Sequence, residues 1–248
     1  MEFWNLYDKI YLITGAGSGI GRETCYTLDS LGARLILLDI NPEGLKETYL
    51  NLKNKTSLSL QIDITDNDSL EIQLKNLLNE IGPINGLVHC AGISSRKPLN
   101  MLRKEGFSKV MEVNFYSFVD LVRIISKKKY LQDGGSIIAM SSISSIKGYK
   151  AKTEYCVSKA SLDAFIRCMA LELAPRKIRI NSIMAAEVNT PMAQKAKELN
   201  SVGNDSFETP LGITEPYEVA NTIAFLLSEA TKTITGSSIL IDGGALLV

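Results

Sequence analysis

The chain has 248 residues, of which 45% are hydrophobic and 22% charged, a length and composition that suit one large domain with a sizeable core. Lys plus Arg and Asp plus Glu both total 27, so the formal net charge is zero and the sequence pI is about 6.6. This balance argues against a binder of nucleic acid or another polyanion.

The cysteines, the histidine and the hydropathy narrow the class of protein further. Cys25, Cys90, Cys156 and Cys168 form no CxxC pair, which indicates free buried thiols in a reducing cytoplasm. The single histidine, His89, lies in an apolar run and is interpreted as structural, and we expect no metal site. No apolar run has the length of a membrane span, and no basic region precedes an apolar segment at the N-terminus, so we expect neither membrane insertion nor a signal peptide.

The first predicted elements form a nucleotide site. Residues 10–13 are a buried strand candidate that runs directly into the glycine-rich segment Thr14–Gly21, and a helix pattern follows over residues 20–31. Glycines allow a tight turn and a close approach of phosphate, while the helix N-terminus offers unpaired N–H groups. Strand, glycine turn and helix together predict a dinucleotide pyrophosphate site.

The second strand, over residues 34–38, ends in Asp39. An acid at this place accepts hydrogen bonds from the adenosine ribose hydroxyls and repels a 2′-phosphate, which favours NAD over NADP. No Arg or Lys stands at Ala16, Ser18 or Ile40 to receive such a phosphate. A second role stays open, because Asp39 also precedes Asn41-Pro42 and is placed to cap the next helix.

The alternation of helix and strand continues through the first half. Helices are expected over residues 45–52 and 66–81, and strands over residues 57–62 and 84–89. Repeated βαβ units predict an α/β fold with a parallel, doubly wound sheet and helices on both faces. Asp63, at the end of the third strand, has two interpretations, a contact to the adenine amino group or a cap of the next helix.

The second half carries the candidate reaction centre. A single long helix is expected over residues 107–130, with Asn114 on its buried side, and a strand over residues 136–140 leads to Ser142. Tyr155 and Lys159 are four residues apart and share one helix face, where the ammonium lowers the pKa of the phenol toward the range of general acid–base catalysis. All of these groups fall near the carboxyl ends of strands, where ligands bind in open parallel sheets.

These motifs, in this order, resemble the classical short-chain dehydrogenase/reductase family, in the branch of the 3-oxoacyl-acyl-carrier-protein reductases. The resemblance covers nearly the whole chain. The matching segments are Thr14–Gly21, Asp63, Cys90-Ala91-Gly92, Asn114, Ser142, Tyr155 with Lys159, Arg179–Ile183, Val188-Asn189-Thr190 and Asp242-Gly243-Gly244.

The family resemblance implies a single Rossmann domain with a seven-stranded sheet, and a role for each matching residue. Tyr155 would be the general acid/base, Lys159 would hold the nicotinamide ribose, Ser142 would bind the substrate oxygen, and Asn114 would support a water in proton relay. Val188 and Thr190 would hold the carboxamide. The cofactor-binding set expected from motif and resemblance together is Gly15, Ser18, Gly19, Ile20, Gly21, Asp39, Asp63, Ile64, Cys90, Ala91, Gly92, Tyr155, Lys159, Val188 and Thr190.

Two departures from the family pattern stand beside the cofactor. His89 and Cys90 replace two asparagines, and Ala185-Ala186 replaces Pro-Gly after the sixth strand. Alanine neither fixes φ as proline does nor adopts positive φ as cheaply as glycine. We therefore expect a different shape or mobility in the loop beside the nicotinamide. Residues 191–212 are expected to form the substrate lid, followed by a helix over 215–227 and a last strand over 238–241.

The motifs predict hydride transfer between NAD and a secondary alcohol or ketone, and we expect a small polar substrate. Five basic residues flank the expected mouth and suit either an anionic substrate or an ordinary solvated surface: Arg96, Lys97, Lys147, Lys150 and Lys152. Asp39, Asp133 and Leu171 weaken the alternative of an acyl-thioester reductase, because the relatives that dock acyl carrier protein are expected to carry basic residues at the last two positions. A second alternative is a non-catalytic NAD-binding regulator. The resemblance also implies a homotetramer, or a dimer, that pairs the helices near residues 107–129 and 153–174.

Overall fold

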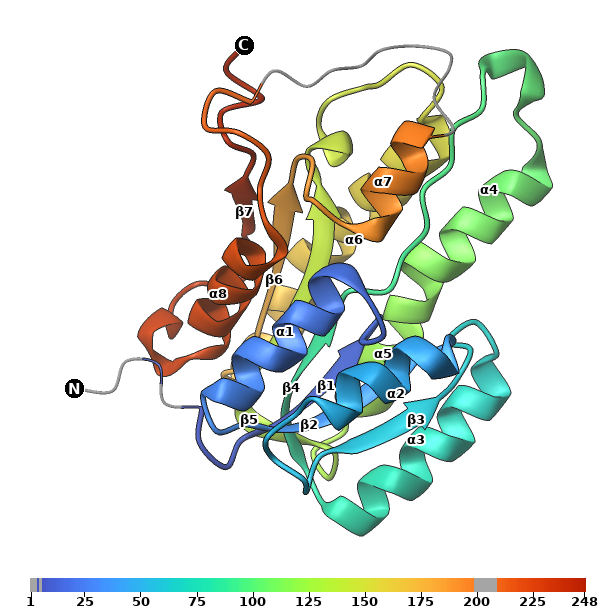
Figure 1. Ribbon diagram of the computed structural model, residues 1–248. Coiled ribbons are helices and arrows are strands. Elements are labelled where there is room, and N and C mark those ends of the chain that lie inside the picture. The colour runs from blue at the N-terminus through green and yellow to red at the C-terminus, as the bar shows by residue number, and fades with distance from the viewer. Residues whose placement is uncertain (1–3, 5, 199–208) are drawn as a thin grey trace.

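The computed structural model describes residue 4, residues 6–198 and residues 209–248, with side chains described through residue 195 and again from 209. One parallel sheet of seven strands, in the order β3-β2-β1-β4-β5-β6-β7, runs through the molecule (Figure 1). The strands are β1 (Ile10–Thr14), β2 (Arg34–Asp39), β3 (Leu58–Gln61), β4 (Ile84–His89), β5 (Leu131–Ser142), β6 (Arg179–Ala185) and β7 (Ser238–Ile241). The expected fold class is confirmed.

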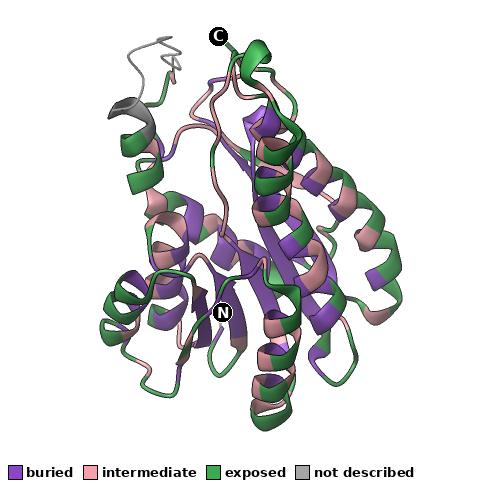
Figure 2. Cartoon of the chain, turned by 90° about the vertical axis from the view of Figure 1, so that its right-hand side faces the viewer, coloured by how far each residue is buried: buried purple, intermediate pink, exposed green. Residues whose placement is uncertain are grey.

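Helices cover both faces of the sheet, and each face has its own apolar core. One face carries α1 (Gly19–Ser30), α2 (Pro42–Leu50) and α8 (Pro216–Leu227). The other carries α3 (Asn67–Ile81), α4 (Lys104–Met111), α5 (Ser117–Ile125) and α6 (Thr153–Leu173). The central strands are buried on both sides (Figure 2), which explains their nearly continuous apolar sequences.

The position of the crevice follows from the strand order. β1 pairs with β2 on one side and with β4 on the other, so the direction of winding reverses between β1 and β4. At this switch point the loops that leave the carboxyl ends of the strands diverge and open a crevice. The chain therefore places Thr14–Gly21 and Cys90-Ala91-Gly92 side by side at one edge of the sheet.

The expected single helix over residues 107–130 is wrong in its bounds and in its regularity. The helical segment begins with α4 at Lys104, passes through a π-helical turn, η2 (Glu112–Tyr116), and ends with α5 at Ile125. After Ser126 come three exposed lysines, Lys127–Lys129, which break the apolar stripe that the helix buries. The strand expected over 136–140 is longer than predicted, because β5 already begins at Leu131.

The expectation that the cysteines are free thiols is confirmed, but the expectation that they are buried holds for one residue only. Cys25 is buried in the core, Cys90 and Cys156 are half-buried, and Cys168 is exposed. Within the described part of the chain, no helix is long and apolar enough to cross a membrane. The same residues contain no group of three or more His, Cys, Asp or Glu side chains that could hold a metal ion.

Candidate active site

Two glycines at the turn between β1 and α1, Gly15 and Gly21, have no room for a side chain. Gly15 has φ +67°, and a Cβ built on it would lie 2.8 Å from Ala91 N; a Cβ on Gly21 would overlap the Gly15 carbonyl. The turn therefore packs directly against the end of β4. Ser18, the N-cap of α1, makes no side-chain cap hydrogen bond, so the first N–H groups of the helix remain available to a phosphate.

A cavity of about 680 Å³ opens above this turn. It brings together most of the cofactor-binding residues expected from the sequence, namely Gly15, Ser18, Gly19, Ile20, Gly21, Asp39, Asp63, Ile64, Cys90, Ala91, Gly92 and Thr190. Val188, Tyr155 and Lys159 are not part of its lining. The sequence reasoning missed several lining residues, among them Ile93, Lys109, Glu112, Val113 and Met192, which carry no motif of their own.

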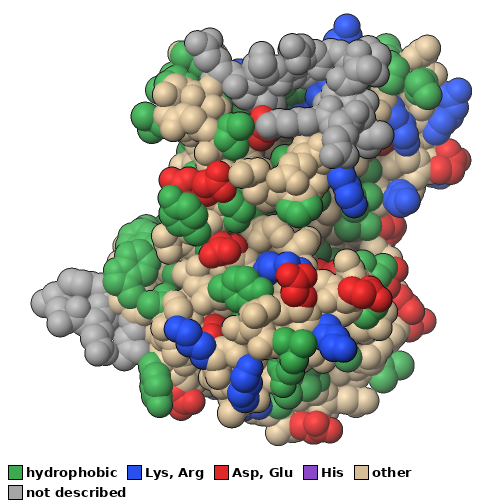
Figure 3. Space-filling model, in the orientation of Figure 1, with side chains coloured by type: hydrophobic (Ala, Val, Ile, Leu, Met, Phe, Trp, Pro, Cys, Tyr) green, Lys and Arg blue, Asp and Glu red, His purple; other side chains and the backbone are tan. Residues whose placement is uncertain are grey.

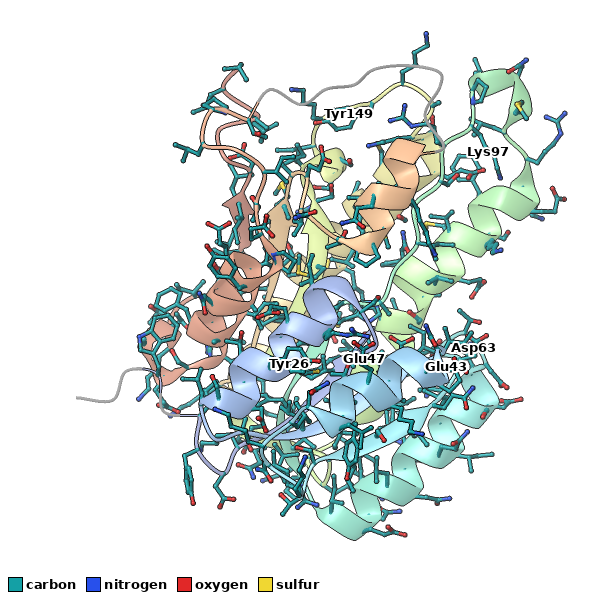
Figure 4. All side chains as sticks on the ribbon, viewed as in Figure 1. Tyr26, Glu43, Glu47, Asp63, Lys97 and Tyr149 are labelled. Atoms are coloured by element: carbon teal, nitrogen blue, oxygen red, sulfur yellow. The ribbon has the colours of Figure 1, made fainter. Side chains whose placement is uncertain are left out.

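The two acidic residues at the expected adenosine end do not cap helices, so that interpretation is wrong for both. Asp39 accepts hydrogen bonds from Gly17 N (2.7 Å) and Asn41 N (2.8 Å), and it is Asn41 that caps α2. Asp63 accepts from Thr65 N (2.9 Å), while Asp66 caps α3. Both carboxylates line the cavity, and Asp63 follows β3, which packs against α2 (Figure 4).

Asn114 lies in the π-helical turn, buried between the loop after β4 and α6. Its side chain accepts from Ile93 N (2.7 Å) and donates to Ile93 O (3.0 Å) and to Ser158 Oγ (3.0 Å). A π turn widens the helix locally and is frequent at functional sites. A Cβ on Gly92 would lie 3.3 Å from Asn114 Oδ1 and 3.7 Å from Lys159 Nζ, so the cavity meets the reaction centre at this glycine.

Tyr155, Lys159 and Ser142 converge as expected, but the pKa of Tyr155 moves in the opposite direction to the prediction. The Lys159 ammonium lies 5.6 Å from the centroid of the Tyr155 ring and donates to Met140 O at 2.7 Å. Burial raises the pKa of Tyr155 to about 12, and its hydrogen bond with Ser142 opposes that rise. Burial likewise lowers the pKa of Lys159 to about 8.

The two residues that replace the family's asparagines are both neutral near pH 7. His89 is fully buried, and its Nδ1 lies 2.9 Å from Thr14 Oγ1, the same oxygen that accepts from Ala91 N. Burial lowers the pKa of His89 to about 3 and raises that of Cys90 to about 12. The structural interpretation of His89 is consistent with this position, because the histidine and Thr14 tie the ends of β4 and β1 together.

Ala185-Ala186 is held in a regular hydrogen-bond pattern. Ala185 is the last residue of β6, Ala186 N donates to Ile241 O (3.0 Å), and Ala186 does not have a positive φ. Val188 is buried and forms a bridge with Thr214. The loop beside the expected nicotinamide position is therefore anchored to the end of β7 and to the chain near Thr214.

The expected lid over residues 191–212 is described only at its two ends. It begins as a helix, α7 (Pro191–Glu198), after Thr190, whose side chain lies above Gly19. Residues 199–208 of the expected lid lie outside the described residues.

The buried carboxylate of Glu154 joins the loop after β4 to the start of α6 at the expected substrate mouth. Glu154, next to Tyr155, accepts from Ser95 Oγ and pairs with Lys97 Nζ at 3.4 Å; Lys97 N also donates to Ala151 O (2.7 Å). Lys97 and Tyr149 both lie at the upper end of the molecule in Figure 4. Glu154 could not be predicted from the sequence, because no motif marks the residue before the tyrosine.

The basic residues at the expected mouth, and Asp133 and Leu171 on the surface, differ in their surroundings. Lys147 Nζ donates to Ala245 O at 3.4 Å. Figure 3 shows Lys and Arg side chains at the upper right, the region of the connection between β4 and α4 in Figure 1. Asp133 pairs with Arg176 at 2.8 Å, and Leu171 is 79% exposed.

Comparison with known proteins identifies the family. The family model described as enoyl-(acyl carrier protein) reductase matches residues 15–245. The NAD-dependent glycerol dehydrogenase of Listeria innocua is 32% identical over 97% of this chain and 95% of its own length. The 3-oxoacyl-(acyl-carrier-protein) reductase of Thermotoga maritima is 33% identical over 98% of this chain and 99% of its own length. The L-xylulose reductase of Mus musculus is 32% identical over 95% of this chain and 95% of its own length.

Solved structures agree with this result. Levodione reductase superposes with a TM-score of 0.88 at 27% identity and covers 98% of this chain and 100% of its own. Carveol dehydrogenase from Mycobacterium avium, solved in complex with NAD, superposes with a TM-score of 0.86 at 25% identity and covers 98% of this chain and 99% of its own. The chain belongs to the short-chain dehydrogenase/reductase family. It is an oxidoreductase that acts on CH–OH or carbonyl groups with a nicotinamide cofactor.

Proposed function

We propose that the protein is an NAD-dependent oxidoreductase that interconverts a secondary alcohol and a ketone on a small polar substrate, with Tyr155 as the general acid/base. The observation that carries this proposal is the Asp39 carboxylate, fixed by Gly17 N and Asn41 N in the wall of the cavity. A carboxylate held there accepts hydrogen bonds from ribose hydroxyls and repels a 2′-phosphate.

The residues of the cavity fit a dinucleotide. The glycine turn leaves no side chain between the backbone and a pyrophosphate, and the N-terminus of α1 offers N–H donors. When bound, the cofactor supplies the exchange of a hydride at the nicotinamide ring. Ser18 and Gly19 would bind the pyrophosphate, Asp39 the adenosine ribose, and Asp63 the adenine amino group.

The reaction groups supply and place a proton. In the reductive direction the carbonyl carbon of the substrate receives the hydride, and the phenol of Tyr155 donates its proton to the carbonyl oxygen. The product is an alcohol. With a pKa of about 12 the phenol is protonated at neutral pH, which is the form this step needs. Ser142 holds the same oxygen by a hydrogen bond, Lys159 holds the ribose, and Asn114 fixes the loop at Ile93.

Two relatives favour a small polar substrate, since their printed names specify glycerol and L-xylulose. The mouth of this chain is polar as well, with Ser95, Lys97 and Glu154 linked to one another beside Tyr155. A reductase of acyl thioesters is the second candidate, favoured by the family model and by the Thermotoga relative. Asp39 argues against NADPH, and Asp133 and Leu171 provide no basic docking site for acyl carrier protein.

We also propose a homotetramer or dimer that pairs α4–α5 and α6 with the same helices of a second copy. Tyr116, Val157 and Leu171 lie exposed on these helices. Sedimentation at micromolar protein concentration tests this proposal, and a monomer would overturn it.

The function is tested by oxidation of NADH and NADPH with a panel of keto sugars, keto acids, small diketones and acetoacetyl thioesters. We expect turnover with NADH on a polar ketone, lost in Tyr155→Phe. Turnover confined to thioesters with NADPH would establish the second candidate. Binding of NADH without turnover on any carbonyl, together with no effect of Tyr155→Phe on function in cells, would instead indicate a non-catalytic regulator.

A further inference from the structure

A second buried carboxylate lies one helical turn beyond the catalytic lysine. Asp163 and Lys159 are four residues apart on α6 and therefore lie on the same face of that helix, the face that packs on the sheet. Asp163 is 5% exposed. It is not among the residues that carry the family resemblance, and the proposed reaction does not use it.

Asp163 binds the sheet through serine side chains. Its Oδ2 accepts from Ser141 Oγ on β5 (2.9 Å), and its Oδ1 accepts from Ser182 Oγ on β6 (2.7 Å). Ser182 Oγ in turn lies 2.9 Å from Ser238 Oγ on β7. One carboxylate of α6 is thus linked through hydroxyls to three neighbouring strands.

The bond to Ser141 lies next to two groups of the reaction centre. Ser141 is preceded by Met140, whose carbonyl accepts from the Lys159 ammonium at 2.7 Å. It is followed by Ser142, whose hydrogen bond reaches Tyr155. Whatever fixes Ser141 therefore also fixes the carbonyl that holds Lys159 and the hydroxyl that holds Tyr155.

Asp163 also places a carboxylate near the buried ammonium and favours its charged form. The titratable groups that face Lys159 are Tyr155 and Asp163 from its own helix, and His89 and Cys90 from the end of β4. Near pH 7 the tyrosine, histidine and cysteine are neutral, because their pKa values are about 12, 3 and 12. Among the described residues that face Lys159, this leaves the Asp163 carboxylate as the source of negative charge, and it acts against burial to raise the lysine pKa.

We propose that Asp163 is a positioning residue of the reaction centre, which keeps Lys159 in its charged form and aligns the end of β5 so that Lys159 and Ser142 meet Tyr155. This inference rests on the proposed function only in that Lys159 must be charged for turnover. If Asp163 merely joined three strands, its removal would lower stability and leave the charge of Lys159 unchanged.

The first experiment separates these two roles by following the Cε signals of Lys159 in protein labelled with ¹³C-lysine, assigned with Lys159→Arg. In Asp163→Asn the pKa of Lys159 is expected to fall by about one unit, toward 7, which lowers its charged fraction at pH 8 from about one half to about one tenth. The alkaline limb of kcat should move to lower pH by the same amount, because activity is lost as pH rises through the lysine pKa. Asp163→Glu, which keeps the charge, should restore the limb.

Ser238→Ala is the matched control. It removes the last hydroxyl of the same network without changing any charge, so the lysine pKa and the pH profile should stay where they are in the wild type. An unchanged lysine pKa in a folded Asp163→Asn variant would overturn the proposal. The lysine signal needs no substrate, so this result stands even if no carbonyl compound is turned over and the proposed function fails.

A second measurement requires no substitution at Asp163. The ¹³Cγ shift of Asp163 in the wild-type chain should show a step at the pH at which Lys159 loses its proton, and the step should be absent in Lys159→Met. A flat ¹³Cγ shift across the titration of Lys159 would show that the two charges are independent, and the proposal would then be wrong.

Discussion

The nucleotide half and the reaction half of the cleft are built from different parts of the chain. Around the turn after β1, the surface consists mainly of backbone, because Gly15 and Gly21 leave no room for a Cβ. Around Tyr155, the surface consists of side chains held by other side chains, such as Asn114 on Ser158 and Asp163 on Ser141. The first half presents fixed donors to a ligand, and the second half fixes the charges and protons of a reaction.

This difference separates binding from chemistry. A substitution in the nucleotide half should change the affinity for a cofactor and leave the acid–base chemistry intact. A substitution in the reaction half should change turnover or its pH dependence while the dinucleotide still binds. His89 lies where the ends of β1 and β4 meet, and Gly106 lies at the substrate mouth, so substitutions there test the two sides of this division.

The largest effect is expected for Tyr155→Phe. Removing the hydroxyl removes the proton donor, and we expect kcat to fall by about 10²- to 10⁴-fold, which corresponds to about 3–5 kcal/mol of transition-state free energy. Because the glycine turn and the Asp39 carboxylate stay intact, the dissociation constant of NADH should change by less than about threefold. Steady-state kinetics and NADH fluorescence measure the two quantities, and a loss of both together would contradict the division.

The next largest effect concerns His89 and acid stability. The folded chain holds this imidazole neutral down to a pKa of about 3, against an ordinary value of 6.5. Between these values the unfolded chain binds the proton and the folded chain does not, so stability falls as pH falls, by up to about 1.4 kcal/mol per pH unit. We expect His89→Asn to flatten the free energy of unfolding between pH 6.5 and 4 relative to the wild type.

Urea unfolding at several pH values measures this slope. Asn is smaller than His, so His89→Asn also leaves a void and lowers stability at pH 7. The absolute stability is therefore not the readout. If wild type and variant lose stability equally between pH 6.5 and 4, the buried histidine does not control the acid limb.

The sequence was most informative where the backbone geometry allows only one residue type. Glycines at 15 and 21 are needed by contacts closer than any Cβ allows, so the nucleotide site could be found from the motif. Helix spacing singled out Tyr155 and Lys159, the polar break in an apolar helix face singled out Asn114, and the family resemblance implied a role for each. Asp163 and Glu154 were missed, because their partners lie on strands and loops far away in sequence, and only folding brings them together.

The same reason explains the errors in charge and in helix shape. Spacing places Lys159 beside Tyr155, but it does not tell how far burial raises the phenol pKa or that the ammonium binds Met140 O. The π turn at Asn114 could likewise not be predicted, because no residue type in the turn distinguishes it from an α-helix with a period of 3.6 residues.

A smaller effect is expected for Asp39→Asn, in the nucleotide half. The change removes the negative charge and keeps the shape, but Gly17 N and Asn41 N bind different oxygens of Asp39, so the single amide oxygen of Asn can accept from only one of them. We expect the ratio of the dissociation constants for NADPH and NADH to fall about 10- to 100-fold, because repulsion of the 2′-phosphate is lost and the charge-assisted bonds to the ribose weaken. Titration calorimetry with both cofactors measures the ratio.

Glu43→Gln is the matched control for this charge. It removes a negative charge from the first turn of α2, at a residue that does not line the cavity and lies at the same end of the molecule as Asp63 in Figure 4. The ratio should change less than threefold. A change as large as that in Asp39→Asn would assign the selectivity to the general acidity of this end rather than to Asp39.

The smallest effect is expected for Gly106→Ala, at the junction of α4 with the mouth. A Cβ there would overlap Glu154 Oε1 and Lys97 Nζ, the ends of two flexible side chains that can move. Alanine in a helix gains up to about 1 kcal/mol over glycine, while a buried carboxylate that loses its partner costs about 1–3 kcal/mol. We expect a net loss of about 1 kcal/mol in urea unfolding and a rise in the substrate KM, with kcat unchanged. Gly148→Ala, whose Cβ meets nothing within 4 Å, is the control and should change neither. A fall in kcat without a rise in KM would mean that Glu154 acts on Tyr155 itself rather than on the loop at the mouth.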